Sequence, residues 1–490
     1  MKPRVVAGPP TVPGPRWPGS GAGAGGILPG MSSPGGDVRT RSRRRRRRAV
    51  TGAALSATLL AALLPACGDD GSGGGDVPAG AQVRGVEGDT ITLGAITVDS
   101  GPMAAAGRSV TAGNQAYFAA LNDDGGVAGR YQVEIEVLDG ADDAATVVRR
   151  YDESHEDVAM YVQALGFRAA GAILEPLMAD DVLAATYALD FPWSRHQNLL
   201  AVGTPVTVGV HNALDRYVHE PGARRVVCAL VDDGDYGAAA ARAVRASATV
   251  LFLDVGPVAT LPTADDGGPS ASVAAAVDGL VRARCDVVVA ATLPADSTAA
   301  LVRAAAVGFE ARWFVPAPGR PSLGDPAVAA YAADHVRVVA DDASWDGVDR
   351  SVDDDEADRD AADEAEGPDD LVAARDAHAP DVADGDPWFL LGYRQAMAAH
   401  QVLERAIDHG DLSQTGILLA ANDTTRLDFA GLAADQRFGA PEYREPSRTS
   451  VLLRPGAPAG ADDAAVVVGP DGPVEGQTAF EEAAQRPLTD

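Results

Sequence analysis

Short apolar runs alternate with longer amphipathic stretches between residues 90 and 317. The short runs are rich in Val, Ile, Leu and Ala, which is typical of strands buried on both faces of a parallel sheet. The longer stretches repeat apolar residues every three to four positions, as helices packed on a sheet do. We therefore expect strands at 91–98, 131–138, 158–165, 225–231, 249–255, 286–292 and 312–317.

These alternating units predict an α/β protein with two doubly wound parallel-sheet lobes joined by a hinge. A single sheet holding all of the strands would be unusually wide. The expected order is lobe 1 at 89–206, lobe 2 at 207–317, the hinge and return to lobe 1 at 318–340, further lobe 1 helices at 387–435, and closing strands of lobe 2 at 436–480.

Residues 341–386 interrupt this pattern. Nineteen of these 46 residues are Asp or Glu, and apolar residues are sparse. Such a segment buries too little surface to offset the loss of chain entropy, so we expect a disordered acidic insertion. A calcium site is the alternative, because carboxylates bind hard cations. However, the run DDDEADRDAADEAEGPDD lacks the ligand spacing and the fixed glycine of an EF-hand loop.

The segment RRRRRRAVTGAALSATLLAALLPAC places a basic block before an apolar stretch and small residues before Cys67. This layout is typical of a secretory signal, and it resembles the lipoprotein box of bacterial precursors. The resemblance implies a leader and signal peptide at 1–66 and a lipid on Cys67, at the outer face of the cell membrane. A spanning helix and a buried free cysteine are the alternatives. The Gly- and Ser-rich residues 67–88 are expected to form a flexible tether.

The charge of the chain narrows the choice of partners. The formal net charge is −30, and 11 of the 40 Lys and Arg residues precede Cys67. Nucleic acid is therefore not an expected partner, because phosphate contacts need clustered basic side chains.

Two further cysteines, Cys228 and Cys285, lie in or beside apolar runs. Buried small hydrophobic side chains are one interpretation, and a disulfide outside the cytoplasm is the other. Two cysteines without paired histidines do not make a zinc site, so no metal and no cofactor are expected.

The order of several short motifs carries a family resemblance. The segment ITLGAITVDSGPMAAAGRSVTAGNQAYFAALNDDGGVAGRYQVEIEVLDG, the run VDDGDYG at 231–237 and the run LLGYRQAMAAHQVLERAIDHGDLSQTGILLA occur in that order. Together they resemble type I periplasmic solute-binding proteins of the branched-chain amino acid ABC transporter class. The resemblance covers roughly residues 88–340 and 387–470. It implies a ligand cleft between two lobes and delivery of the ligand to an ABC permease.

The loop after the first strand supplies the first candidate ligand residues, Asp99, Ser100 and Met103. Ser100 and Pro102 suit a helix start, and the positive end of a helix favours a carboxylate. Such a loop lies at the carboxyl edge of the sheet, where ligands of open α/β sheets bind. Ser100 capping the helix without touching a ligand is the alternative.

The loop after the third strand supplies Phe167, Arg168, Ala169 and Ala170. The resemblance implies hydroxyl side chains at 169–170 to hold a carboxylate, whereas alanine leaves only backbone N–H donors. Arg168 is expected either to make a charge-assisted contact with the ligand or to lie on the rim.

Later loops supply Tyr187 and Asp190 from lobe 1 and Tyr236 from lobe 2. The resemblance implies that Tyr236 closes over the ligand, and packing against a helix turn is its alternative. Where amino acid binders of the family carry an acidic residue for the ligand ammonium, this chain has Pro318. Asp99 and Asp190 are candidates to replace that acid.

These observations favour a monomeric, lipid-anchored solute-binding protein for a small carboxylate-bearing solute, with branched-chain amino acids among the candidates. A ligand sensor or a degenerate binding protein of the same fold is the alternative. The sequence holds no nucleophile elbow, HExxH motif or P-loop, so we do not expect an enzyme.

Overall fold

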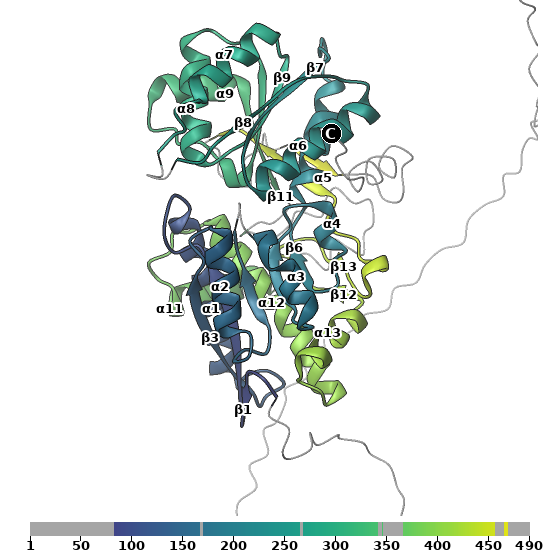
Figure 1. Cartoon of the computed structure of the whole chain (residues 1–490). Coiled ribbons are helices and arrows are strands. Elements are labelled where there is room, and N and C mark those ends of the chain that lie inside the picture. The colour runs from purple at the N-terminus through teal and green to yellow at the C-terminus, as the bar shows by residue number, and fades with distance from the viewer. Residues whose placement is uncertain are drawn as a thin grey trace, which may run out of the picture. The chain divides into compact units, whose positions relative to one another are not determined.

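The computed structural model describes residues 83–166, 170–264, 268–341, 345 and 366–455, and the backbone of 465–468 (Figure 1). The expected leader and signal peptide, Cys67 and most of the tether lie outside these residues. The described chain forms two α/β lobes, each with its own sheet. The predicted fold class is confirmed.

The sheet of lobe 1 has six strands in the order β1-β2-β4-β5-β6, with β3 also paired to β2. All pairs are parallel except β1 with β2. Apart from β1 and β3, its strands are almost entirely buried, as the apolar runs predict. The strands are β1 (Val86–Glu87), β2 (Thr90–Thr97), β3 (Gln132–Asp139), β4 (Tyr161–Ala164), β5 (Ala184–Tyr187) and β6 (Leu199–Val202).

Two glycines allow the principal helices of lobe 1, α1 (Ala104–Asp123) and α12 (Pro387–His409), to lie in close contact. A Cβ on Gly113 would lie 2.1 Å from the Phe389 carbonyl oxygen, and one on Gly392 would lie 1.9 Å from the Val110 carbonyl oxygen. The remaining elements of this part are α2 (Ala144–Ser154), η1 (Ala170–Ile173), α3 (Leu174–Ala179), α4 (Phe191–Ser194), α11 (Gly367–His378), α13 (Gln414–Asp423), β12 (Arg426–Leu427), β13 (Gln436–Arg437) and η4 (Pro441–Tyr443).

The sheet of lobe 2 has seven strands in the order β15-β14-β11-β10-β9-β7-β8. The pairs from β11 to β8 are parallel, and β14 pairs antiparallel with β11 and β15. The strands are β7 (Val226–Asp232), β8 (Asp254–Leu261), β9 (Val287–Ala291), β10 (Arg312–Pro316), β11 (Val336–Asp341), β14 (Thr449–Leu453) and β15 (Ala465–Val468). The helical elements are α5 (Val206–Val218), α6 (Asp235–Leu251), α7 (Val273–Ala283), α8 (Pro294–Ala306), η2 (Ala317–Gly319) and α9 (Pro326–His335).

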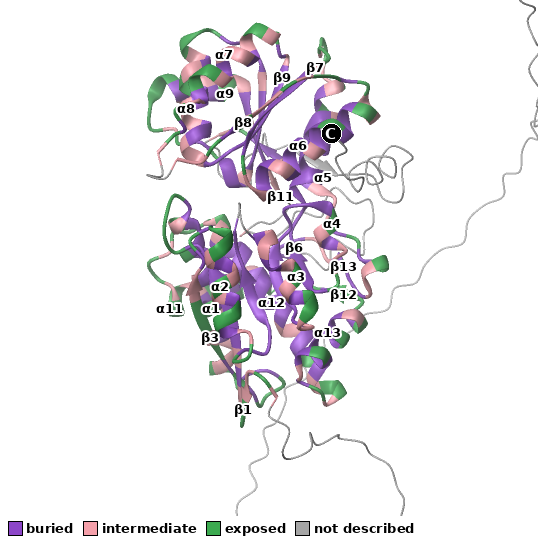
Figure 2. Cartoon of the chain, viewed as in Figure 1, coloured by how far each residue is buried: buried purple, intermediate pink, exposed green. Residues whose placement is uncertain are grey.

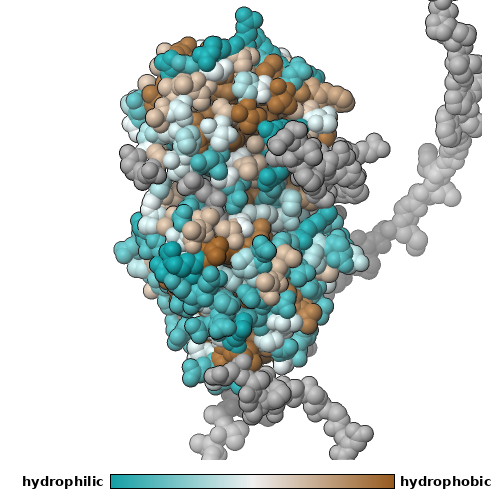
Figure 3. Space-filling view, in the orientation of Figure 1, coloured by the Kyte–Doolittle hydropathy of each residue, from teal (hydrophilic) through white to brown (hydrophobic). Residues whose placement is uncertain are grey.

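Burial follows the layers of each lobe. The strands of both sheets are mostly buried, while the exposed residues lie on the outer helix faces and loops (Figure 2). On the visible face hydrophilic residues predominate, and hydrophobic ones gather only in small groups (Figure 3). Within the described ranges, no helix has the length and apolarity needed to span a bilayer.

Three sequence expectations are corrected. Residues 318–340 do not return to lobe 1, because β11 adds to the lobe 2 sheet beside β10. The segment 341–386 is not wholly irregular, because helix α11 forms at 367–378. The run 249–255 is not one strand. Its first residues complete α6, Phe252 ends that helix in a left-handed conformation with φ 55°, and β8 begins at Asp254.

The crossing segments between the lobes are linked to one another. The first is 203–205, between β6 and α5, and another is 438–448, between β13 and β14. The Thr204 hydroxyl group lies 2.9 Å from Ser447 Oγ and 2.6 Å from the Thr449 carbonyl oxygen. These bonds hold two crossing segments side by side at the hinge.

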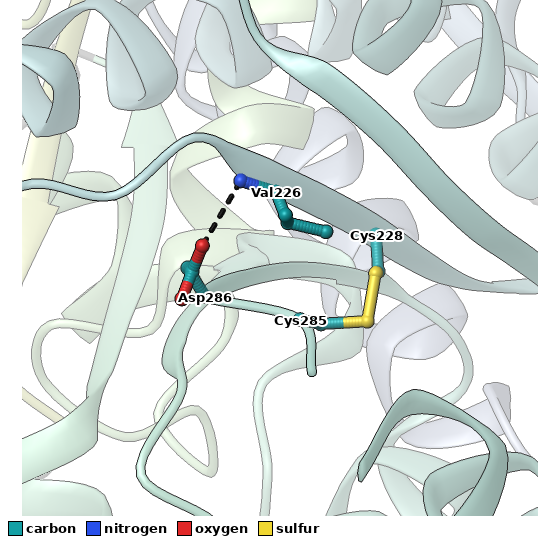
Figure 4. Close-up of a disulfide and its surroundings, with 4 residues drawn as sticks. All are labelled: Val226, Cys228, Cys285 and Asp286. Carbon is teal, nitrogen blue, oxygen red and sulfur yellow. Dashed lines mark hydrogen bonds between the residues drawn. A yellow bond between two sulfur atoms is a disulfide. The ribbon is translucent and has the colours of Figure 1, made fainter. Parts of the chain in front are cut away.

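Lobe 2 contains a disulfide between Cys228 in β7 and Cys285 just before β9 (Figure 4). Both residues are buried, and their Cα atoms are 5.8 Å apart. Next to it, the Asp286 carboxylate accepts a hydrogen bond of 3.0 Å from the Val226 amide. Of the two interpretations of these cysteines, the structure supports the disulfide.

Replacing both cysteines in a Cys228→Ala/Cys285→Ala variant is expected to lower the free energy of unfolding by about 2–4 kcal/mol, because a cross-link restricts the unfolded chain. The disulfide joins residues 57 positions apart. Urea unfolding under oxidising conditions measures the change. Wild-type protein unfolded with a reductant is the control, and it should approach the stability of the variant. Equal stability of the oxidised wild type and the variant would contradict the prediction.

Candidate functional site

A cavity of about 510 Å³ lies between the two lobes. Lobe 1 lines it with the start of α1, the end of β5 and the start of α12. Lobe 2 lines it with the turn after β10, the end of β11 and the first residue of α8. The carboxyl ends of parallel strands from both sheets therefore meet at one cavity, which is where open α/β sheets bind ligands.

Met103 and Tyr187 are the two predicted site residues that line this cavity. Met103 immediately precedes α1, and Tyr187 is the last residue of β5. Both side chains are largely buried, so they form the wall and do not project into solvent. Burial raises the pKa of Tyr187 well above its usual value, and the nearby Asp341 adds to the shift. Its hydroxyl group therefore stays neutral.

Asp99 and Ser100 do not line the cavity. Both are exposed, and the Asp99 carboxylate forms an ion pair with Arg108. Helix α1 begins only at Ala104, so the expected cap by Ser100 is absent. Desolvation raises the pKa of Asp139, but hydrogen bonds from this loop outweigh it and lower that pKa overall. The loop therefore donates hydrogen bonds to Asp139, the last residue of the neighbouring strand β3.

The sequence predicts that the loop after β4 holds a ligand carboxylate through its backbone N–H groups. Phe167, Arg168 and Ala169 lie outside the described residues. Ala170 is buried at the start of η1, and the next amide, that of Gly171, donates a 2.8 Å hydrogen bond to Asp235 Oδ2. Asp235 belongs to α6 of lobe 2, so a carboxylate of the protein itself occupies this donor.

A second interlobe contact joins Asp190 to Arg242 on α6. Asp190 precedes α4 and also accepts a 2.8 Å hydrogen bond from the Phe191 amide. Its side chain is only 6% exposed, and this desolvation raises its pKa although the Arg242 charge opposes the shift. Asp190 is therefore paired with Arg242 of lobe 2 and is not among the residues that line the cavity.

Tyr236 does not close over the cavity. Its side chain is fully buried, and its hydroxyl group donates a 3.2 Å hydrogen bond to the Pro316 carbonyl oxygen at the end of β10. The turn that begins there carries Pro318 and Arg320, which both line the cavity. Tyr236 therefore does not line the cavity itself, and its hydrogen bond holds in place the turn that does.

Sequence reasoning missed the ion pair between Asp341 and Arg394, which also lines the cavity. Arg394 Nη1 on α12 lies 2.9 Å from Asp341 Oδ2 at the end of β11, and the Arg394 side chain is 2% exposed. The long apolar helix pattern gave no reason to single out one arginine. Because β11 pairs in parallel with β10, its last residue, Asp341, lies at the same carboxyl edge of the sheet as the end of β10.

Asp232, in the run VDDGDYG, is the last residue of β7 in lobe 2. One carboxylate oxygen accepts hydrogen bonds from the Gly234 and Gly237 amides at 2.8 and 3.0 Å. Burial raises the pKa of Asp232 to about 7, with smaller contributions from Asp142 and Asp233. The carboxyl group is thus partly protonated near neutral pH.

The described residues contain no cluster of three His, Cys, Asp or Glu side chains arranged to hold a metal ion. The arrangement that is present, an apolar cavity with a few charged groups from both lobes, is suited to binding a small organic molecule.

Replacing Arg242 by Gln is expected to lower the free energy of unfolding by about 2–3 kcal/mol, because Asp190 would remain buried without its cation. Urea unfolding checks this. The Asp190→Asn/Arg242→Gln double variant is the matched control and should recover part of the loss, since it removes the charge left unpaired. If the single variant is as stable as the wild type, the pair does not hold the lobes together.

The comparisons agree with this geometry. A family model described as "periplasmic binding protein" matches residues 90–454. A fatty acid ABC transporter substrate-binding protein from Thermomonospora curvata has a similar structure, with a TM-score of 0.64 and 22% identity over 80% of this chain and 95% of that one. No curated protein matches the chain by sequence.

Two further solved structures share the fold at lower identity. A branched-chain amino acid ABC transporter protein from Thermus thermophilus, solved with bound valine, has a TM-score of 0.60 and 14% identity over 81% of this chain and 99% of that one. A leucine-binding protein from Thermotoga maritima has a TM-score of 0.57 and 15% identity over 77% and 98%. The chain therefore belongs to the periplasmic binding protein family and has the type I two-lobe fold of the leucine/isoleucine/valine-binding class.

Proposed function

We propose that the protein captures a small carboxylate-bearing solute between its lobes outside the cytoplasm and delivers it to an ABC importer. The observation that carries this proposal is the cavity of about 510 Å³ lined by strand ends and helix starts of both lobes. A ligand that touches both lobes favours the closed arrangement, because only that arrangement provides all of its contacts.

The similar proteins support a solute of this kind. One is described as a fatty acid binder, another as a leucine-binding protein, and a third was solved with valine. All three names refer to carboxylates with an apolar body. Branched-chain amino acids are therefore among the candidate ligands, and the protein acts as a monomeric binder without catalytic activity.

A ligand sensor or a degenerate binding protein is the second candidate. The contact between Gly171 and Asp235 favours it, because a carboxylate of the protein fills a backbone donor of lobe 1. The Asp190–Arg242 pair likewise joins the lobes without a ligand. Binding experiments separate a degenerate protein, which takes up no small carboxylate, from a transporter component.

Binding is expected to raise the melting temperature of the full chain, because a ligand at 100 times its dissociation constant adds about 2.7 kcal/mol to the free energy of unfolding. A thermal-shift screen of amino acids and small carboxylic acids measures this. In an Ala105→Trp variant the new ring should fill the cavity from α1 and abolish the shift. The matched control is Gln115→Trp, at an exposed position on α1 outside the lining. Shifts that persist in Ala105→Trp would place the ligand elsewhere.

Lipid attachment at Cys67 is the further part of the proposal. The family is extracytoplasmic, and the buried Cys228–Cys285 disulfide supports an oxidising compartment. A lipid on Cys67 would keep the protein on the outer face of the cell membrane beside the permease.

Changing Cys67 to Ser is expected to move the protein from the membrane fraction to the soluble extracytoplasmic fraction of a bacterial host. Fractionation followed by immunoblotting measures the distribution. The Cys228→Ala/Cys285→Ala variant is the control, since it removes two other cysteines and should stay with the membrane. Retention of Cys67→Ser in the membrane fraction would refute anchoring through this residue.

A further inference from the structure

Arg320 is a charged residue of the cavity lining whose role is not explained by contacts within the described residues. It follows the short helix η2 in lobe 2 and lines the cavity. Within the described part of the chain, its guanidinium group makes no ion pair and no side-chain hydrogen bond. Its surface is accessible, yet the surrounding protein desolvates the guanidinium enough to lower the pKa of Arg320.

This arginine differs from the other one in the lining. Arg394 is almost fully buried and is neutralised by Asp341 at 2.9 Å. In a chain of net charge −30, acidic side chains greatly outnumber basic ones. A partly desolvated arginine that has no carboxylate partner among the described residues is therefore unusual here, and it is suited to an anionic group carried by a ligand.

The backbone of the turn that carries Arg320 is held in place by close contacts with the rest of lobe 2. A Cβ on Gly319 would lie 2.4 Å from the Thr292 carbonyl oxygen, so the backbone sits too close to β9 for any other residue. The Tyr236 hydroxyl group bonds to the Pro316 carbonyl oxygen just before this turn. Arg320 therefore extends from a rigid base, as a ligand-binding group requires.

The acidic side chains of the lining already have partners. Asp341 pairs with Arg394, and Asp384 pairs with Arg375. Asp386 caps α12 by accepting hydrogen bonds from the Trp388 and Phe389 amides, and its other oxygen accepts one of 2.8 Å from Ser109 Oγ. An ammonium group entering the cavity would have to compete with these bonds.

The rest of the lining is largely apolar. Met103 and Pro102 contribute from the start of α1, Trp388 and Leu391 from α12, and Pro318 from lobe 2. Liquid water occupies about 30 Å³ per molecule, so the cavity has room for more than the roughly nine non-hydrogen atoms of leucine. An apolar wall strengthens binding of a ligand with an apolar body, because binding removes hydrocarbon surface of both from water.

We propose that the ligand is an amphipathic carboxylic acid without an ammonium group. Its carboxylate binds Arg320, and its apolar body packs against Met103, Pro318 and Trp388. This inference rests on the proposed function and narrows its ligand class away from α-amino acids.

The test compares acids that differ from amino acids only by the ammonium group. Isothermal titration calorimetry with the full chain uses 4-methylpentanoate against leucine and 3-phenylpropionate against phenylalanine. The wild type is expected to bind each plain acid at least about tenfold more tightly than its amino acid, because the acidic side chains among the described lining residues already have partners. The neutral 3-phenylpropionamide reports the apolar contribution alone.

Arg320→Gln is expected to weaken binding of 3-phenylpropionate about 10- to 100-fold and to leave binding of 3-phenylpropionamide unchanged. Arg320→Lys keeps the charge and should retain part of the affinity. The matched control is Arg245→Gln, which removes the same charge from an exposed position on α6 outside the lining and should bind like the wild type.

The outcomes separate this inference from the proposed function. Tighter binding of leucine or phenylalanine than of the plain acids would overturn the ligand class while upholding a solute-binding protein. Equal affinity of Arg320→Gln and wild type for 3-phenylpropionate would overturn the role of Arg320. If no acid, amide or amino acid binds, the proposed function itself fails, and this inference fails with it.

Discussion

A parallel sheet must be covered on both faces, and this requirement shapes each lobe. Helices cover both faces of the central strands of each sheet, so apolar side chains fill both sides of those strands. Polar chemistry is then restricted to the strand ends and the loops that leave them. The cavity lies at that edge in both lobes, and the site is therefore a direct consequence of how the sheets are buried.

The same edge concentrates charged groups that must find partners. Asp190, Asp235 and Asp341 all find theirs in the opposite lobe, since Asp341 ends β11 of lobe 2 and its partner Arg394 lies on α12 of lobe 1. Separation of the lobes would return Asp190 and Arg242 to water, which solvates both charges. The pair is therefore compatible with a moving hinge.

The architecture was predictable from the sequence because strands buried on both faces have a strong apolar signature. Errors arose where one apolar run serves two elements, as at 249–255, where a helix end and a strand start share Val, Leu and Phe. Residues 318–340 were assigned to the wrong lobe, because a parallel strand at the sheet edge and a hinge strand have the same pattern.

The site was predictable only in part, because sequence locates the loops but not the direction of their side chains. Met103 and Tyr187 line the cavity, whereas Asp99 pairs with Arg108 and Tyr236 points beneath the turn after β10. Arg320 escaped notice because its importance depends on lacking a described partner, and partners across the fold cannot be read from neighbours in the chain.

The position of the disulfide has a mechanical consequence. Cys228 and Cys285 both belong to the lobe 2 sheet, so the covalent link closes a ring inside a single lobe. Backbone torsions in the 203–205 crossing segment remain unrestrained by it. Lobe 2 can therefore rotate as one stiff body, and a small twist at the hinge displaces the distant surface of that lobe without deforming its interior.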